Sequence, residues 1–68
     1  MLDSTDDPVE ALQLAIKREE AAYQFYKKHA SLFKNEATKQ MFEMLAEEEI
    51  KHKEKLQAEL DDYYMSEM

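Results

Sequence analysis

Apolar residues recur along this chain at alternating intervals of three and four, and that rhythm constrains the fold more than any other feature. The first run comprises Val9, Leu12, Ile16, Tyr23, Tyr26, Ala30 and Phe33. The second run comprises Thr38, Phe42, Leu45, Leu56 and Tyr63. Such spacing places each run on one face of an α-helix. The chain has no glycine and its one proline is residue 8, so an all-α fold is predicted.

Capping residues mark the ends of the two helices. Asp7-Pro8-Val9-Glu10 predicts a helix start, because aspartate accepts backbone N–H bonds and proline suits the first helical position. Lys34-Asn35-Glu36 holds the turn, where Asn35 can cap the second helix. We therefore predict one domain over residues 1–68, an antiparallel hairpin with helices at about 8–33 and 36–62 and a turn at 34–35.

The chain is too short for a stable isolated hairpin. Chains below roughly 70 to 80 residues usually need disulfides, a metal or oligomerisation, and this one has 68 residues and no cysteine. In a hairpin of two helices, one side of each helix also lacks a partner. We therefore expect at least a homodimer, in which two hairpins form a four-helix bundle.

The charge balance disfavours several classes of partner. Sixteen acidic residues against nine basic ones give a formal net charge of −7, which argues against nucleic acid and anionic membranes and suits cation binding. The sequence has no long apolar run, and its first residues lack the basic and apolar segments of a secretory signal. A cytoplasmic protein with no nucleic-acid or membrane partner is predicted.

Polar residues interrupt the apolar runs, and three of them lie at related positions. Glu19 falls within the first run, and Glu49 and His52 fall within the second, on which Glu59 lies nearer the open end of the hairpin. A Glu-x-x-His pair places both side chains on one helical face, about one turn apart. Because both helices rise equally per residue, folding at residue 34 places Glu19 opposite Glu49. The two spacings therefore predict one polar layer between apolar layers.

A bound metal ion would explain why a polar layer lies between apolar layers. Two facing carboxylates repel each other, and burying them ionised costs several kcal/mol each unless a cation compensates. Carboxylates with one imidazole suit iron or manganese, and zinc can compete. Glu19, Glu49 and His52 are the predicted ligands, with Glu48 as the alternative carboxylate on the second helix. Two hairpins related by a two-fold axis would supply four glutamates and two histidines, enough for two divalent ions per dimer.

Two segments of the chain carry a family resemblance. Ala15-Ile-Lys-Arg-Glu19-Glu-Ala-Ala22-Tyr-Gln-Phe25-Tyr26 and Leu45-Ala-Glu-Glu-Glu49-Ile-Lys-His52 resemble the ferritin-like di-iron family, in its rubrerythrin-like branch. A full bundle of that family carries the helix pair twice, whereas this sequence has it once and is similar in that respect to the two-helix encapsulated ferritins. The resemblance implies two iron ions per dimer, Glu19 and Glu49 as ligands, and His52 as a terminal ligand.

The resemblance also implies roles around this site. Tyr26 would lie near it, and Tyr26 and Tyr23 could hydrogen-bond its ligands, although their spacing equally fits core aromatics. Glu20 could be a carboxylate at which metal ions enter, or a solvated residue paired with Arg18, Lys17 or Lys27. His29 lies off the first run and is predicted as a partly exposed or intersubunit histidine.

The chain also departs from the family patterns. It has no cysteine pair of the rubredoxin type, and Phe25 stands where encapsulated ferritins tend to have tryptophan. Likeness to the encapsulated ferritins suggests a ring such as a decamer, housed inside an encapsulin-type shell.

Two functions are predicted from these features. The first is a ferroxidase-type oxidoreductase that oxidises iron(II) with O₂ or peroxide, in iron storage or in protection against oxidative stress. The second is a non-catalytic helical oligomerisation module, in which the buried Glu and His layer sets the register of a dimer. Saturable binding of iron is expected for the first function and not for the second.

Overall fold

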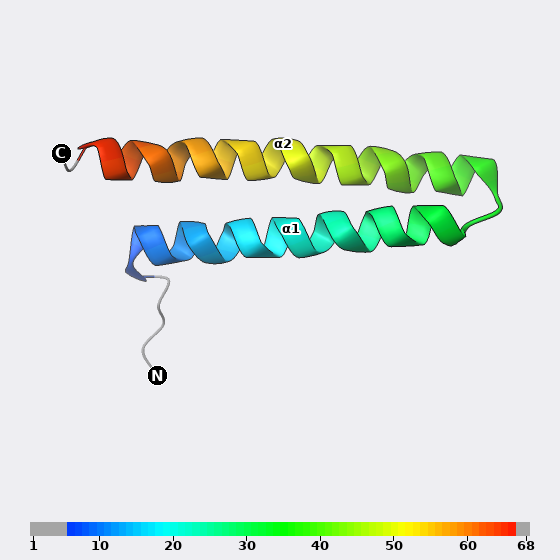
Figure 1. Cartoon of the computed structure of the whole chain (residues 1–68), viewed down its shortest axis with the longest axis horizontal. Coiled ribbons are helices and arrows are strands. Elements are labelled where there is room, and N and C mark those ends of the chain that lie inside the picture. The colour runs from blue at the N-terminus through cyan, green and yellow to red at the C-terminus, as the bar shows by residue number, and fades with distance from the viewer. Residues whose placement is uncertain (1–5, 67–68) are drawn as a thin grey trace.

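The computed structural model describes residues 6–66, and they form two α-helices joined by a short turn. Helix α1 spans Pro8–Leu32 and helix α2 spans Glu36–Ser66. The helices run antiparallel and lie side by side, and the C-terminal end of α2 projects beyond the start of α1 (Figure 1). The predicted all-α helical hairpin is confirmed for these residues, and the ends of the predicted domain, 1–5 and 67–68, lie outside them.

The start of α1 follows from two neighbouring residues. The Oδ1 atom of Asp7 accepts a hydrogen bond of 3.0 Å from the backbone N–H of Val9, and Pro8 occupies the first helical position. Aspartate thereby satisfies one of the N–H groups that a helix start leaves without an intrahelical partner. Proline loses nothing there, because its missing N–H would have had no such partner.

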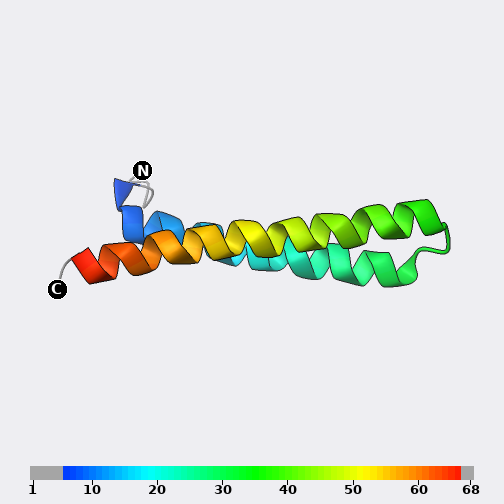
Figure 2. The same ribbon diagram turned by 90° about the horizontal axis from the view of Figure 1, so that it is seen from above.

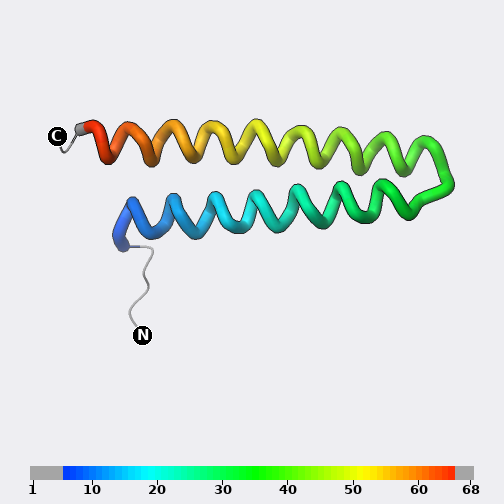
Figure 3. Tube along the Cα trace, in the orientation of Figure 1, coloured from blue at the N-terminus to red at the C-terminus, as the bar shows by residue number. Residues whose placement is uncertain are grey.

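The turn is equally local in origin. The backbone N–H of Phe33 donates to the carbonyl of His29 at 3.2 Å, which completes the last turn of α1. Two residues later, the Oδ1 atom of Asn35 accepts a 3.0 Å hydrogen bond from the backbone N–H of Thr38. Asn35 therefore caps α2, and the trace reverses at this point so that α1 begins and α2 ends at the opposite end of the hairpin (Figure 3).

Helix α2 is longer than the sequence indicates. Its predicted end lies near residue 62, whereas the helix continues to Ser66. Near this end, the Nε2 atom of Gln13 on α1 donates a 3.3 Å hydrogen bond to the hydroxyl of Tyr64. The acidic, aromatic residues at the end of α2 thus still have a neighbour on the other helix.

Aromatic rings fix the register of the helices near the turn. The rings of Tyr26 and Phe42 meet edge to face with centroids 5.7 Å apart, and those of Phe33 and Phe42 do so at 4.9 Å. Folding the chain at residue 34, which places Glu19 opposite Glu49, also places Tyr26 opposite Phe42. Edge-to-face pairs of this kind add roughly 0.5 to 1.5 kcal/mol beyond their buried area. The register that the sequence predicts is therefore present.

The face of α2 toward α1 is rotated from the predicted one. The observed face carries buried and half-buried residues at intervals of three and four: Lys39, Phe42, Ala46, Glu49, Lys53, Leu56 and Leu60. Phe42, Glu49 and Leu56 belong to both faces, whereas Thr38, His52 and Glu59 of the predicted face are exposed. The buried Ala46, only 1% exposed, explains the rotation, since a small side chain lets the two helices approach closely.

The hairpin forms a single layer. Its smallest dimension is 12 Å, about the diameter of one helix with its side chains, and Figure 2 shows the two helices crossing at a shallow angle. Among the described residues, only Ala30, Ala46 and Leu60 are buried apolar residues. The large exposed apolar residues are Leu14, Phe25, Leu32, Met41, Met44, Tyr63, Tyr64 and Met65.

So thin a layer leaves much apolar surface without protein cover. A monomer rarely exposes this many large apolar side chains without a partner for them. Within residues 6–66, neither helix contains a stretch long and apolar enough to cross a membrane.

Candidate metal centre

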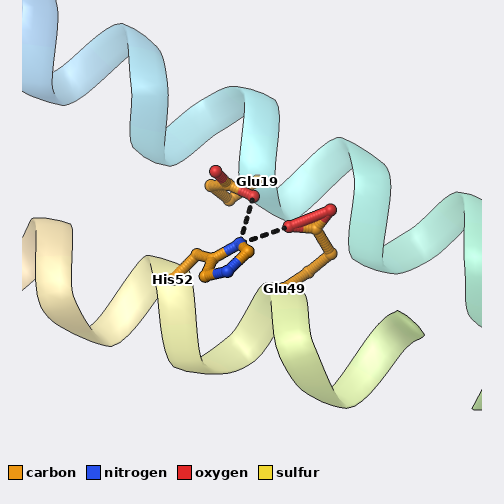
Figure 4. A network of polar contacts seen from close by, with 3 residues as sticks. All are labelled: Glu19, Glu49 and His52. Carbon is orange, nitrogen blue, oxygen red and sulfur yellow. Dashed lines mark hydrogen bonds and ion pairs between the residues drawn. The ribbon is translucent and has the colours of Figure 1, made fainter. Parts of the chain in front are cut away.

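Three side chains from both helices converge halfway along the hairpin. The Nδ1 atom of His52 lies 3.2 Å from Glu49 Oε1 on the same helix and 3.8 Å from Glu19 Oε1 on the other helix (Figure 4). One ligand atom from each residue lies within 4.8 Å of the others. The structure thus brings together the three residues that the sequence singles out as ligands.

Helical geometry explains why they meet. Glu49 and His52 are one turn apart on α2, so both side chains lie over the same stretch of α1. Glu19 enters this stretch from the face of α1 that packs against α2, in the register already fixed by Tyr26 and Phe42. No loop takes part, so the rigid helices hold the arrangement.

The three side chains differ in their exposure. The carboxylates are largely shielded, with side chains 16% exposed for Glu49 and 25% for Glu19, whereas the His52 side chain is 56% exposed. The cluster is therefore closed toward the hairpin and open on one edge. The sequence predicts His52 in the apolar seam between the helices, and the structure corrects this: the imidazole lies at the margin of that seam.

The carboxylates interact unfavourably when both are charged. The pKa of the Glu19 carboxyl is raised, first by a hydrogen bond with the Glu49 carboxyl, then by burial and by the Glu49 charge, while the charge of His52 opposes the rise. Repulsion between neighbouring carboxylates favours the protonated form, as does removal from water. A cation between them would replace the proton and relieve the same repulsion.

The donor set fits a first-row divalent ion. Ligand atoms about 2.0 to 2.2 Å from one ion are separated from each other by roughly 3 to 4.4 Å. The distances from His52 Nδ1 to the two carboxylate oxygens, 3.2 and 3.8 Å, fall in that range. Two carboxylates with one imidazole are donors that suit iron and manganese and that zinc also accepts. Three ligands also leave positions open for further donors or a reactant.

The alternative carboxylate for this cluster lies elsewhere. Glu48 is exposed and is not among the three residues whose ligand atoms converge, whereas Glu49 is half-buried and takes part. The spacing that places Glu49 opposite Glu19 therefore also distinguishes it from Glu48.

The two tyrosines are part of the packing between the helices. Tyr26 contacts the rings of Phe25 and Phe42. Tyr23 lines a groove of about 540 Å³ together with Ala46 and Ile50, and charged residues surround it. Among the described residues, neither hydroxyl hydrogen-bonds to Glu19, Glu49 or His52. Their role near a bound metal stays a prediction.

Glu20 is paired more firmly than the sequence indicates. Its carboxylate accepts hydrogen bonds from Lys53 of α2 and, at 3.1 Å, from Gln24 of α1. The predicted basic partners were residues of α1, and the observed one comes from the other helix. The sequence contained a signal for this pair, because Lys53 continues the spacing of Ala46 and Glu49 along α2.

The remaining histidine lies away from the cluster. The Nδ1 atom of His29 is 2.9 Å from the carbonyl oxygen of Phe25, and its ring lies against the Phe25 ring with centroids 4.2 Å apart. This half-buried histidine belongs to an aromatic group near the turn, which the sequence does not predict, and its partial exposure agrees with its place off the first apolar run.

Comparison with known proteins agrees with this geometry. The family model for rubrerythrin matches residues 4–68, which is nearly the whole chain. The chain belongs to the rubrerythrin family. Domains of this family are ferritin-like and bind a di-iron centre, so the predicted family is confirmed, while likeness to the encapsulated ferritins stays a prediction. No curated protein and no solved structure matches the chain.

Proposed function

We propose that two copies of this hairpin pair to form a four-helix bundle, and that the pair oxidises iron(II) at a centre built from Glu19, Glu49 and His52 of both chains. The observation that carries the proposal is the convergence of three ligand atoms within 4.8 Å on an open edge of the hairpin. Membership of the rubrerythrin family supports iron as the metal.

The ligand count favours a pair of chains. Two divalent ions carry four positive charges, and Glu19 and Glu49 of two chains supply four negative ones. A single chain would hold one ion with three protein ligands and a histidine more than half exposed. A second hairpin placed over that edge would cover the imidazole and complete the donor set.

Exposed apolar residues support the same contact. Met41 and Leu45 precede His52 by eleven and seven residues, so they share its face of α2. Met41 is 59% exposed and Leu45 is half-buried. The partner that covers His52 would therefore also cover apolar surface, at about 25 cal/mol for each Å² removed from water.

The side chains of the cluster have distinct tasks in this proposal. The carboxylates of Glu19 and Glu49 bind and charge-balance iron(II) as substrate, and His52 provides a neutral nitrogen donor through Nδ1. A bound di-iron centre supplies the redox chemistry, in which two iron(II) ions give up two electrons that reduce O₂ to peroxide or peroxide to water. The surrounding helices hold the donors in place and leave the remaining coordination positions to the oxidant.

Anaerobic titration with iron(II) tests the proposal. We expect saturation near one ion per chain, followed by ferric absorbance when air is admitted. Glu19→Gln removes a donor and should abolish both signals, whereas Glu10→Gln makes the same change at an exposed position of the same helix and should leave them intact. Absence of saturable binding by the unaltered chain would favour the oligomerisation module instead.

Sedimentation with and without metal tests the shared site. A site split between chains links metal binding to association, so iron or manganese should strengthen the dimer. A monomer that binds metal at full stoichiometry would refute the pairing. A ring such as a decamer, an encapsulin-type shell and a role in iron storage or oxidative stress stay predictions.

A further inference from the structure

One basic residue lies on the face of α2 that packs against α1. Lys53 continues the line of Ala46 and Glu49 on this face, and its side chain is 36% exposed. A lysine in such a position packs its methylene stem against the neighbouring helix and directs its ammonium group to the edge. There it donates to Oε1 of Glu20 on α1.

Both oxygens of Glu20 are engaged in this arrangement. Oε1 accepts from Lys53, and Oε2 accepts from Gln24 at 3.1 Å. Glu20 directly follows the proposed ligand Glu19, and neighbouring residues of a helix point about 100° apart. His52 and Lys53 are neighbours in the same way, so they leave α2 toward different edges of the seam. The ion pair therefore holds Glu20 on the edge away from His52.

This pair also sets the charge around the cluster. Glu19, Glu20 and Glu49 would together carry three negative charges per chain, and Lys53 reduces this to two. Two negative charges per chain are what two divalent ions in a pair of chains require. Freed from Lys53, the Glu20 side chain would be able to turn toward Glu19 and bring an oxygen donor and a negative charge to the metal.

We infer that Lys53 is a specificity-determining residue of the metal centre, because it holds Glu20 out of the ligand set and keeps each half-site at two carboxylates and one imidazole. This inference rests on the proposed function, since it requires a metal bound by Glu19, Glu49 and His52. Ions that prefer oxygen donors, such as manganese(II), gain more from an added carboxylate than zinc(II) does. Lys53 therefore limits the preference of the site for such ions.

Binding of manganese(II) and zinc(II) to the full chain tests the inference. We expect Lys53→Met to raise the affinity for manganese(II) on the order of tenfold, because an unpaired carboxylate lies near a divalent ion, and to raise that for zinc(II) less. Lys53→Gln, which keeps a polar side chain on this face, should produce the same change. Lys55→Met removes the same charge from an exposed position of α2 and should bind both metals like the unaltered chain.

The double variant isolates the contribution of Glu20. Adding Glu20→Gln to Lys53→Met should return manganese(II) affinity to the unaltered level, because the freed carboxylate is gone. The inference alone is overturned if Lys53→Met matches Lys55→Met, or if the double variant keeps the raised affinity. A failure of the unaltered chain to bind either metal or iron would refute the proposed function and this inference together.

Discussion

Replacement of Glu49 by glutamine should make the metal-free protein more stable while it weakens the binding of iron(II). Glutamine keeps the shape of the side chain and its ability to accept a hydrogen bond from His52, but removes one of two charges that oppose each other. The relevant oxygens lie within 4.8 Å. At 4.8 Å, the upper limit of this separation, the repulsion is about 0.9 kcal/mol with the dielectric constant of water and about 1.7 kcal/mol with half of it, and it grows as the oxygens approach.

The exposure of the cluster decides which end of this range applies. Glu49 and Glu19 are mostly shielded, whereas the open edge at His52 admits water. We therefore expect Glu49→Gln to raise the free energy of unfolding at pH 7 by about 1 kcal/mol in the absence of metal. The same variant loses one donor per chain, and its iron(II) affinity should fall at least about tenfold.

Urea unfolding followed by circular dichroism measures the first effect, and anaerobic titration measures the second. Both should be done at one chain concentration, because association contributes to apparent stability. Glu48→Gln is the control, since it removes the same charge from the adjacent, exposed residue. If the two variants were equally stable without metal, or if Glu49→Gln bound iron(II) like the unaltered chain, the reasoning about opposed carboxylates would be wrong.

Two further predictions concern pH and packing. The folded state raises the pKa of Glu19 above its ordinary value of 4.5. At a pH between 4.5 and the raised pKa, the folded chain therefore binds more protons than the unfolded chain does. Stability of the metal-free protein relative to Glu19→Gln should therefore increase as pH falls through the raised pKa toward 4.5, and a difference that stays flat over this window would contradict it. Ala46→Leu should destabilise the hairpin by about 1 to 3 kcal/mol, because Ala46 is 1% exposed between the helices. The exposed Ala58→Leu should change the free energy of urea unfolding by less than about 0.5 kcal/mol, and equal effects of the two would refute close packing at Ala46.

Most of the fold follows from local signals in the sequence. Asp7 and Asn35 cap the helices where the capping rules place them, and the rhythm of apolar residues identifies the face of α1 that packs. The spacing of Glu49 and His52, combined with the register, also brings Glu19 into the same cluster. Each of these features depends on the sequence of one helix, or on counting residues from the turn along the two helices.

The rotation of α2 could not be predicted in the same way. Two faces of α2 fit the same spacing. One face includes Leu45 and His52, the other includes Ala46 and Lys53, and the apolar residues alone do not show which of them packs against α1. The choice depends on how closely the two helices approach, which the small Ala46 permits, and on the pairing of Lys53 with Glu20. Both are relations between helices and are absent from the pattern of either one.

A donor set divided between two chains, as proposed, would have a consequence for mixed populations. Among the described residues, each chain brings Glu19, Glu49 and His52 together as one half of such a set, so a chain lacking Glu49 would still present the proposed pairing surface to an intact copy. In a cell that makes both in equal amounts, most pairs would contain at least one defective chain, and the intact copies in those pairs would be disabled with it. Such an allele would act as a dominant inhibitor, and the loss of activity would exceed the share of altered chains.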